Sequence, residues 1–251
     1  MRRGPMRVAF LGATRGMGRA LARRMAERGD RLFLLGRDLE DLRRTADDLA
    51  IRGRGGEAFG AARCDLMDPS TFPAALGEAE ATLGGLDAVV VTAGVFATQD
   101  RLEADPELAA RVLTVDFTHT VLFCEEARRR LLAAGGGKLA VFSSVAGERG
   151  RKPTVLYGAS KAGLTRYLEG LDHRFWSDGL EVITVKPGFV RTSMTAGLKE
   201  PPFAGDPEPV AERVLKAIDR GRPVVYAPFM WGLVMWVIRR LPRFVMRRVA
   251  F

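Results

Sequence analysis

Cysteine and histidine are both rare in this sequence, which has two of each in 251 residues. Cys64 and Cys124 fall at the end of an apolar strand pattern and in a helical pattern. We therefore expect reduced, buried thiols and no disulfide framework. His119 and His173 stand alone, without Cys, His or carboxylate neighbours at the spacing of a metal site, so they are expected to be ordinary helix residues. No metal is predicted.

We expect neither a linker that divides the chain nor a signal peptide. No long stretch rich in proline or serine interrupts it, and no internal repeat is evident. With 47% hydrophobic residues, the chain can bury one large core. The opening residues 1–5 are too short for a signal peptide, because the apolar run after them belongs to the first expected strand. We therefore expect a single domain in the cytoplasm.

Strand and helix patterns alternate along the chain. Strand patterns occupy residues 6–11, 31–35, 57–63, 86–91, 137–143, 180–186 and 223–227. Helical patterns occupy a stretch that ends at Arg28 and residues 38–52, 70–83, 106–133, 155–178 and 208–220. This alternation predicts an α/β fold, a doubly wound parallel sheet of the Rossmann type flanked by helices. We expect this domain to span residues 1–228, with a C-terminal tail over 229–251.

A glycine-rich turn joins the first expected strand to the helix after it. Residues 12–18 read Gly-Ala-Thr-Arg-Gly-Met-Gly. Glycines let the backbone approach a pyrophosphate, and the helix amino terminus offers unpaired N–H groups and a positive dipole end. The segment therefore predicts a dinucleotide site, although a glycine-rich turn alone also fits a tight loop.

Tyr157 and Lys161 are four residues apart in a helical pattern, and Ser144 precedes the tyrosine by thirteen residues. Four helical residues advance about 6 Å and slightly more than one turn, so the phenol and the ammonium project from one face. Because a cation beside a phenol favours the phenolate, we expect Lys161 to lower the pKa of Tyr157. Ser144 can hold a carbonyl oxygen while Tyr157 protonates it as a hydride arrives at carbon. Alone, such a pair is usually a solvated helix face.

Together these segments resemble the short-chain dehydrogenase/reductase family over about residues 6–227. The resemblance rests on the Gly-x-x-x-Gly-x-Gly spacing, on residues 91–94 (Val-Thr-Ala-Gly), on residues 142–147 and 186–192, and on the Tyr-x-x-x-Lys pair. It implies a nicotinamide-dependent oxidoreductase with Ser144, Tyr157 and Lys161 as catalytic residues. The cofactor-binding residues that it implies are Gly12, Thr14, Arg15, Gly16, Met17, Gly18, Arg37, Asp65, Leu66, Ala93, Gly94, Tyr157, Lys161, Pro187, Gly188, Val190 and Thr192.

The sequence departs from the family pattern at Asp116. The family has an asparagine at this position, where it supports a water chain to the lysine. An aspartate can still hold that water, but its negative charge can raise the pKa of Lys161, or the carboxyl can itself be protonated. Asp116 is therefore a fourth candidate catalytic residue. The alternative is a structural hydrogen bond at a helix kink.

The charges after the second strand favour NADP(H) over NAD(H). Gly36 stands where an acidic residue would bind a free ribose hydroxyl. Arg37 and Arg15 can both face a 2′-phosphate. Alternatively, Arg37 is a surface cation that pairs with the adjacent Asp38.

The C-terminal tail is basic and apolar. Residues 222–251 contain six arginines and no acidic residue, and residues 229–238 form an apolar run. Ten helical residues rise about 15 Å, half the hydrocarbon thickness, so this run is too short to span a bilayer. Trp231 and Trp236 with flanking arginines suit peripheral contact with the inner face of the plasma membrane. Alternatively, the run packs on the domain or on a partner subunit. Nucleic acid is not predicted, because the charge lies beside a long apolar stretch.

Four segments within residues 143–251 carry a narrower resemblance: residues 147–151 (Gly-Glu-Arg-Gly-Arg), the helical pattern 157–164, the loop 190–200 and the arginine-rich tail. Together they resemble the decaprenylphosphoryl-2-keto-ribose reductases. This implies NADPH-dependent reduction of a ketone on a hydrophobic or lipid-linked substrate, such as a polyprenyl-phosphate keto-sugar. Arg191 and Lys199 would then be candidate phosphate contacts or else solvated loop charges. One alternative is a soluble 3-oxoacyl or small-ketone reductase. Another is a nucleotide-binding scaffold without turnover, although the intact Ser144, Tyr157 and Lys161 disfavour it. Because the family is mostly dimeric or tetrameric, we expect a homo-oligomer.

Overall fold

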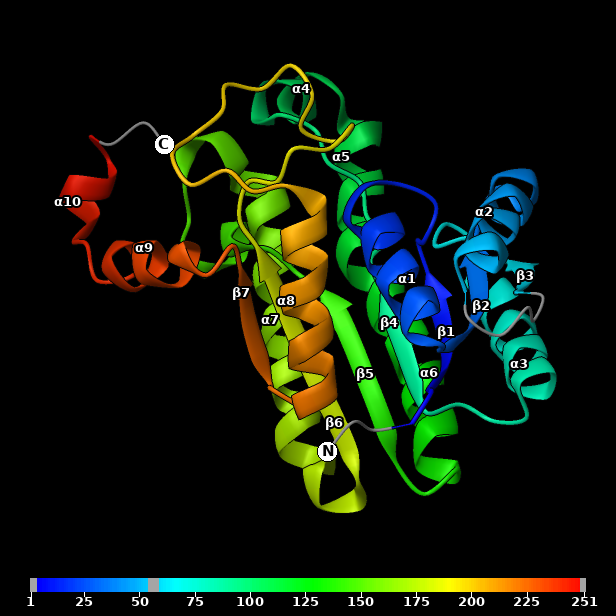
Figure 1. Cartoon of the computed structure of the whole chain (residues 1–251). Coiled ribbons are helices and arrows are strands. Elements are labelled where there is room, and N and C mark those ends of the chain that lie inside the picture. The colour runs from blue at the N-terminus through cyan, green and yellow to red at the C-terminus, as the bar shows by residue number, and fades with distance from the viewer. Residues whose placement is uncertain (1–3, 54–58, 249–251) are drawn as a thin grey trace.

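A seven-stranded parallel sheet forms the centre of the computed structural model, which describes residues 4–53 and 59–248 (Figure 1). The strand order is β3-β2-β1-β4-β5-β6-β7, so the order reverses direction between β1 and β4. The strands are β1 (Arg7–Leu11), β2 (Arg31–Gly36), β3 (Gly60–Arg63), β4 (Ala88–Val91), β5 (Gly137–Phe142), β6 (Leu180–Pro187) and β7 (Val224–Ala227). The predicted Rossmann-type fold is thus confirmed. Residues 57 and 58 of the third expected strand lie outside the described residues.

Helices cover both faces of the sheet, and the strands are apolar on both faces. One layer packs α1 (Gly16–Arg28), α2 (Leu39–Arg52) and α8 (Pro207–Arg220) against inward side chains such as Phe10 and Val90. The other packs α3 (Thr71–Leu83), α6 (Thr120–Ala133) and α7 (Val155–Phe175) against side chains such as Leu11 and Val91. Successive strand residues point to opposite faces, so a continuous apolar run serves both layers.

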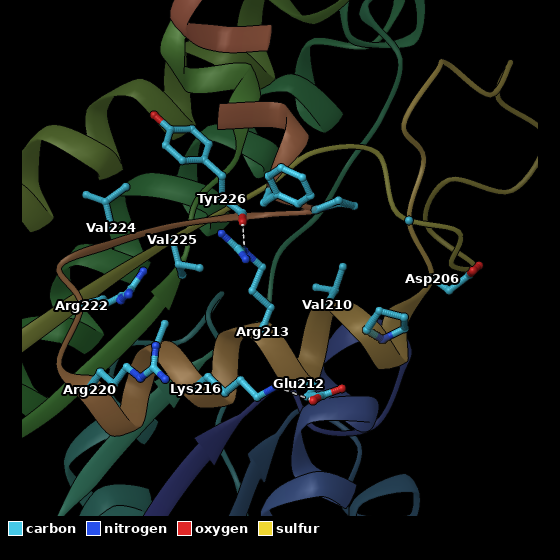
Figure 2. Close-up of a pocket in the computed structure, with 15 residues that line it drawn as sticks. Asp206, Val210, Glu212, Arg213, Lys216, Arg220, Arg222, Val224, Val225 and Tyr226 are labelled. Carbon is cyan, nitrogen blue, oxygen red and sulfur yellow. Dashed lines mark hydrogen bonds and ion pairs between the residues drawn. The ribbon is translucent and has the colours of Figure 1, made fainter. Parts of the chain in front are cut away.

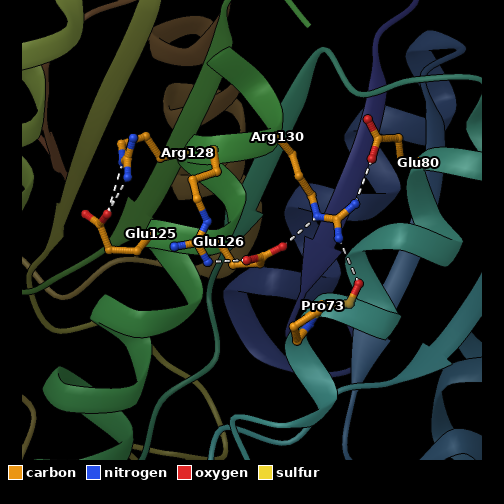
Figure 3. Close-up of polar contacts among 7 residues, drawn as sticks. Pro73, Glu80, Glu125, Glu126, Arg128 and Arg130 are labelled. Carbon is orange, nitrogen blue, oxygen red and sulfur yellow. Dashed lines mark hydrogen bonds and ion pairs between the residues drawn. The ribbon is translucent and has the colours of Figure 1, made fainter. Parts of the chain in front are cut away.

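Ion pairs join two helices of the second layer (Figure 3). Arg130 on α6 donates to Glu126 one turn earlier and to Glu80 on α3, at 2.9 and 2.8 Å. The same guanidinium donates to the Pro73 carbonyl at the start of α3, at 3.0 Å. One arginine therefore links α3 to α6 within the same helical layer.

The expected helix over residues 106–133 is three segments. Its first part is α5 (Pro106–Leu113), capped by the side chain of Asp105, which accepts from Leu108 N at 3.0 Å. A π-helical turn, Thr114–His119, follows and leads into α6. Single π turns occur often at functional sites, and this one contains Asp116. A further short helix, α4 (Gln99–Ala104), was not predicted.

The structure also contains three short 3₁₀ helices, two between β5 and α7 and one directly after α7. They are Val145–Glu148, Lys152–Thr154 and Trp176–Asp178. The last of them continues α7, so the helix expected over 155–178 is α-helical only as far as Phe175.

Both cysteines lie in the core, as predicted. Burial raises the pKa of the Cys64 thiol to about 12 and raises that of Cys124 as well. The two side chains therefore behave as small apolar groups.

The C-terminal tail forms two helices, α9 (Met230–Ile238) and α10 (Arg243–Met246). Figure 1 shows them beyond the β7 edge of the sheet. Within the described part of the chain, no helix has both the length and the apolar character needed to cross a bilayer. Trp231, Met235 and Ile238 on α9 are buried against the domain. The packing alternative is therefore correct for one side of α9.

Candidate active site

The candidate residues gather at the carboxyl ends of the strands. The glycine-rich turn follows β1, Ala93 and Gly94 follow β4, Ser144 follows β5, and Gly188 follows β6. In a doubly wound sheet, ligands bind at this edge where the strand order reverses. Here that point lies between β1 and β4.

The glycine-rich turn has backbone geometry that other residues would disturb. Gly12 has φ +98°, and a side chain there would lie 2.6 Å from Ala93 N. A side chain at Gly18 would collide with the Gly12 carbonyl oxygen. Thr92, which replaces the family's asparagine, donates from Oγ1 to that same carbonyl at 2.8 Å. Residues from β1, α1 and the end of β4 therefore hold the turn in one conformation.

This turn fits the pyrophosphate of a dinucleotide. Helix α1 starts at Gly16, and its N-cap residue Arg15 makes no side-chain capping hydrogen bond. The first N–H groups of α1 are thus available for an anion. A side chain at Gly16 would lie 3.2 Å from Thr192, so the turn sits against the loop after β6. The two segments would hold adjacent parts of the same cofactor, the pyrophosphate and the nicotinamide half.

Charged residues lie after β2 and in the glycine-rich turn, where we expect the adenosine ribose of the cofactor. Arg37 is exposed, and Asp38 caps α2 by accepting from Glu40 N and Asp41 N, both at 3.0 Å. Among the described residues no ion pair joins Arg37 to Asp38, whereas the exposure of Arg37 agrees with the alternative of a surface cation. Arg15 is bonded to Asp41 at 3.0 Å, although its side chain is 75% exposed.

Two of the expected cofactor-binding residues, Asp65 and Leu66, follow β3. Asp65 is partly buried, and its carboxylate accepts from Met67 N at 2.9 Å. The next residue, Leu66, is buried. The Asp65 carboxylate is thus held in a local turn beside an apolar side chain.

Ser144, Tyr157 and Lys161 converge as the sequence predicts. The Ser144 hydroxyl lies close enough to the Tyr157 phenol to lower its pKa, and it accepts from Ala146 N at 3.0 Å. Lys161 Nζ lies 5.6 Å from the centre of the Tyr157 ring. Ser143 donates to the Lys161 carbonyl at 3.0 Å, which ties the end of β5 to α7. This hydrogen bond helps to fix the position of Ser144 relative to Tyr157 and Lys161.

The pKa of Tyr157 corrects one expectation. Burial raises it well above the ordinary value, the negative charge of Asp116 raises it further, and the Ser144 hydrogen bond lowers it. The expected lowering of this pKa by Lys161 is not found, and the group that lowers it is Ser144. A raised pKa keeps the phenol protonated at neutral pH, which is the form that donates a proton to a carbonyl oxygen.

Asp116 lies beside Lys161, fully buried. Its Oδ1 is 3.6 Å from Lys161 Nζ and accepts from Val95 N at 2.8 Å. A side chain at Gly94 would lie 2.9 Å from this oxygen, so the glycine after β4 permits the approach. Burial raises the pKa of Asp116, and the lysine cation opposes that effect. The relay role stays a prediction, but the contact with Lys161 is direct.

The loop after β6 closes the site on the expected nicotinamide side. Pro187 ends β6, and Val190 is buried and bridges to Gly205. A side chain at Gly188 would collide with the Trp231 indole. Helix α9 therefore rests directly on the backbone of this loop.

The two candidate phosphate contacts differ in their surroundings. Arg191 is bonded to Glu200, with Nε at 3.0 Å, and to Asp206 at 3.0 Å. Two carboxylates thus neutralise the charge that was expected to meet a phosphate. Lys199 is exposed.

Two residues around Tyr157 were not predicted. The Gln99 side-chain oxygen accepts from Val155 N at 2.9 Å and from Leu156 N at 3.1 Å, at the start of α7. The Phe96 ring packs edge-on against the Tyr157 ring, with centroids 5.0 Å apart. Neither residue is part of a sequence motif. Each contacts a segment far from it in the sequence, so no local pattern could indicate its role.

A separate groove of about 430 Å³ lies between α8 and β7 (Figure 2). Its basic residues include Arg213, which donates to the Tyr226 carbonyl at 2.6 Å, and Lys216, which is bonded to Glu212. None of the candidate catalytic residues lines it. The chemistry described above therefore belongs to the carboxyl edge of the sheet and not to this groove.

Comparison with known proteins agrees with the geometry of the site. The family described as short chain dehydrogenase matches residues 7–202. Oxidoreductase Rv2073c of Mycobacterium tuberculosis is 32% identical over 242 residues, which cover 96% of each chain. Carbonyl reductase family member 4 of Xenopus tropicalis is 29% identical over 237 residues, 91% of this chain and 94% of that one.

A solved structure shares the fold. The short-chain type dehydrogenase/reductase from Mycobacterium marinum has a TM-score of 0.79, with 24% identity, over 90% of this chain and 96% of that one. None of these names bears on the narrower resemblance to the keto-sugar reductases, which stays a prediction. The chain belongs to the short-chain dehydrogenase family, and it is an oxidoreductase that acts on CH–OH and C=O groups with a nicotinamide dinucleotide as cofactor.

Proposed function

We propose that the protein uses NADPH to reduce a ketone on a hydrophobic or lipid-linked substrate, such as a polyprenyl-phosphate keto-sugar. The observation that carries the proposal is the Tyr157 phenol, whose pKa burial raises, placed close to Ser144 and one helical turn from Lys161 at the carboxyl edge of the sheet. Tyr157 can donate a proton and Ser144 a hydrogen bond to the same carbonyl oxygen. Reduction of a ketone to an alcohol requires that proton at the carbonyl oxygen.

Each residue has one task in this reaction. The Ser144 hydroxyl orients the carbonyl oxygen, and Tyr157 gives that oxygen its proton. Lys161 stabilises the phenolate that remains, because its cation lies 5.6 Å from the ring centre. A bound nicotinamide would supply the hydride. Asp116 keeps Lys161 in place through their 3.6 Å contact.

The preference for NADPH is supported by the residues after β2. Gly36 offers no carboxylate to a ribose hydroxyl, and its only possible side-chain direction is filled by Leu42, which would lie 3.2 Å from an added Cβ. Arg37 is exposed at this position, since Asp38 is engaged in capping α2. Its guanidinium suits bidentate contact with a phosphate.

The preference for an apolar substrate is supported by the loop after β6. Met194 and Phe203 on this loop are large apolar side chains with 45% and 52% of their surface exposed. With Arg191 engaged by two acids, Lys199 is the candidate for a phosphate on the substrate. A soluble reductase of 3-oxoacyl groups or small ketones is the alternative.

The test is turnover of a series of ketones of increasing chain length with NADPH and with NADH, followed by absorbance of the reduced nicotinamide. The proposal expects a higher kcat/KM with NADPH and a rise with chain length. Equal use of both cofactors would contradict the NADPH assignment, and loss of activity on long ketones would favour the alternative. The variant Arg37→Ala should raise KM for NADPH about tenfold, equivalent to about 1.4 kcal/mol, and leave KM for NADH unchanged. Arg44→Ala, which removes an arginine that lies on α2 and is bonded to Glu40, is the control.

A further inference from the structure

Helix α9 is apolar on both sides, and only one side is covered. Trp231, Met235 and Ile238 face the domain, where they pack with Val145 and Phe189. The opposite side and the helix after it leave large apolar side chains between 51% and 61% exposed. We call these five residues the tail face: Phe229, Leu233, Trp236, Val237 and Phe244.

Four of the five residues of the tail face form a stripe along α9 and its N-cap, and the fifth, Phe244, lies on α10. Residues 229, 233, 236 and 237 recur at intervals of three and four, which places them on one side of a helix. Large apolar patches on a protein surface mark contacts with another protein or with a membrane. The charges around the patch decide between them.

Arginines surround the tail face. Arg240 lies over the Trp236 ring, with its guanidinium carbon 4.1 Å from the ring centre. Arg243, Arg247 and Arg248 on and after α10 are exposed, and among the described residues these four arginines have no acidic partner. Only Arg239 in this segment is neutralised, by Glu148 at 3.0 Å. Apolar side chains with tryptophan beside unpaired arginines are typical of segments that lie in the interface of a bilayer with anionic headgroups.

A second copy of the chain is a poorer occupant. A two-fold contact brings the same patch of both copies together, so Arg240 and Arg243 would face their own counterparts. The chain also carries a net charge of +9, which opposes self-association. An anionic surface meets neither obstacle.

We propose that the tail face docks on the surface of a lipid bilayer that contains anionic lipids. The surface is rigidly tied to the catalytic region. Trp231 donates to the Phe203 carbonyl in the loop after β6 at 3.0 Å, and Arg149 donates to the Leu241 carbonyl at 2.9 Å. Docking therefore brings the segment beside Ser144 close to the membrane. The proposal does not depend on which ketone the enzyme reduces.

The structure corrects the sequence-based version of this idea. Trp231 was expected to contact the membrane together with Trp236, but Trp231 is only 7% exposed and belongs to the packed side. Membrane contact and packing are alternatives in the sequence-based prediction. In the structure one side of α9 packs on the domain, and the other side is available for membrane contact.

The test is co-sedimentation of the full-length protein with vesicles of phosphatidylcholine alone and of phosphatidylcholine mixed with phosphatidylglycerol. Binding should be stronger on the mixed vesicles and should weaken as salt is added, since salt screens the arginines. The double variant Leu233→Ser and Trp236→Ser should bind at least tenfold more weakly. Arg243→Gln with Arg247→Gln should remove the preference for the anionic lipid.

The matched control is Trp176→Ser. Trp176 is 71% exposed and follows α7 at the opposite end of β6, so its loss should leave vesicle binding unchanged. Circular dichroism of each variant checks folding. Equal binding by the double variant and the parent, or no binding by the parent, would overturn the proposal. Sedimentation velocity gives a further check, because an oligomer that the double variant dissociates would assign the tail face to a second copy.

Discussion

At the scale of the residue, we expect the charge at Asp116 to set the alkaline limit of the reaction. The buried carboxylate contacts Lys161 and raises the pKa of Tyr157, while Val95 N holds it in place. Reduction uses the protonated phenol, so activity is present below the folded-state pKa of Tyr157 and is lost as the pH rises through it. A change at Asp116 therefore moves the alkaline limit of activity.

Asp116→Asn keeps an oxygen for Val95 N but removes the negative charge. The pKa of Tyr157 should then fall, so the alkaline loss of kcat/KM should begin at a lower pH than in the parent. The measurement is kcat/KM for the ketone across neutral and alkaline pH. An unchanged profile would mean that Asp116 carries no charge in the parent enzyme. Asp116→Ala removes both the charge and the hydrogen bond from Val95 N. Comparison of the two variants therefore distinguishes the effect of the charge from the effect of the hydrogen bond.

At the scale of the element, the start of α7 is fixed by α4. Gln99 is 8% exposed, and its side-chain oxygen accepts from the two N–H groups that precede Tyr157. First-turn N–H groups have no partner within their own helix, so Gln99 satisfies two of them. Through them it is a positioning residue for Tyr157.

Gln99→Met keeps the length of the side chain and removes the acceptor. We expect stability to fall by about 1–3 kcal/mol, the cost of leaving buried donors unpaired. We expect kcat to fall about tenfold, equivalent to about 1.4 kcal/mol in the barrier, with KM for NADPH unchanged. Steady-state kinetics and thermal unfolding measure both. The control is Glu103→Gln, which alters the partner of the Gln99 amide nitrogen at 2.8 Å and spares its oxygen. A kcat that stays at the parent value in Gln99→Met would remove the positioning role.

Sequence patterns predicted the strands well, because buried parallel strands are continuous apolar runs such as Ala88–Val91. They also placed Ser144, Tyr157 and Lys161 together, since the spacing of a helical turn and the ends of parallel strands are regular. They did not predict the π-helical turn at Asp116, because a single wide turn is a local feature inside an otherwise helical stretch. They did not predict α4 either, because six residues are too few to show a helical period. Gln99 had no motif, and the raised pKa of Tyr157 depends on burial that only the packed structure defines.

At the scale of the whole molecule, the tail is partly integrated into the domain. The inner side of α9 packs on Val145, the residue after Ser144, and Trp231 covers Gly188. Lys186 and Glu148 form a buried ion pair under the same helix, and Arg239 of α9 joins it. The end of the chain thus supports the catalytic loop.

Two tryptophans on α9 allow this integration to be tested. Trp231→Ala should reduce the free energy of unfolding by about 3–5 kcal/mol, the usual cost of removing a buried aromatic side chain. Trp236→Ala, which removes a side chain that is 53% exposed, should change it by less than about 0.5 kcal/mol. Denaturant unfolding measures both. Equal effects would mean that α9 does not pack on the domain as described.

The account as a whole depends on Tyr157 as the proton donor in carbonyl reduction. The most direct measurement is single-turnover oxidation of bound NADPH by a ketone in the parent and in Tyr157→Phe, with NADPH binding measured separately by fluorescence. We predict that the variant binds NADPH as the parent does but transfers hydride about 10²–10⁴-fold more slowly, the usual contribution of a positioned acid. Hydride transfer at the parental rate in Tyr157→Phe would contradict the account.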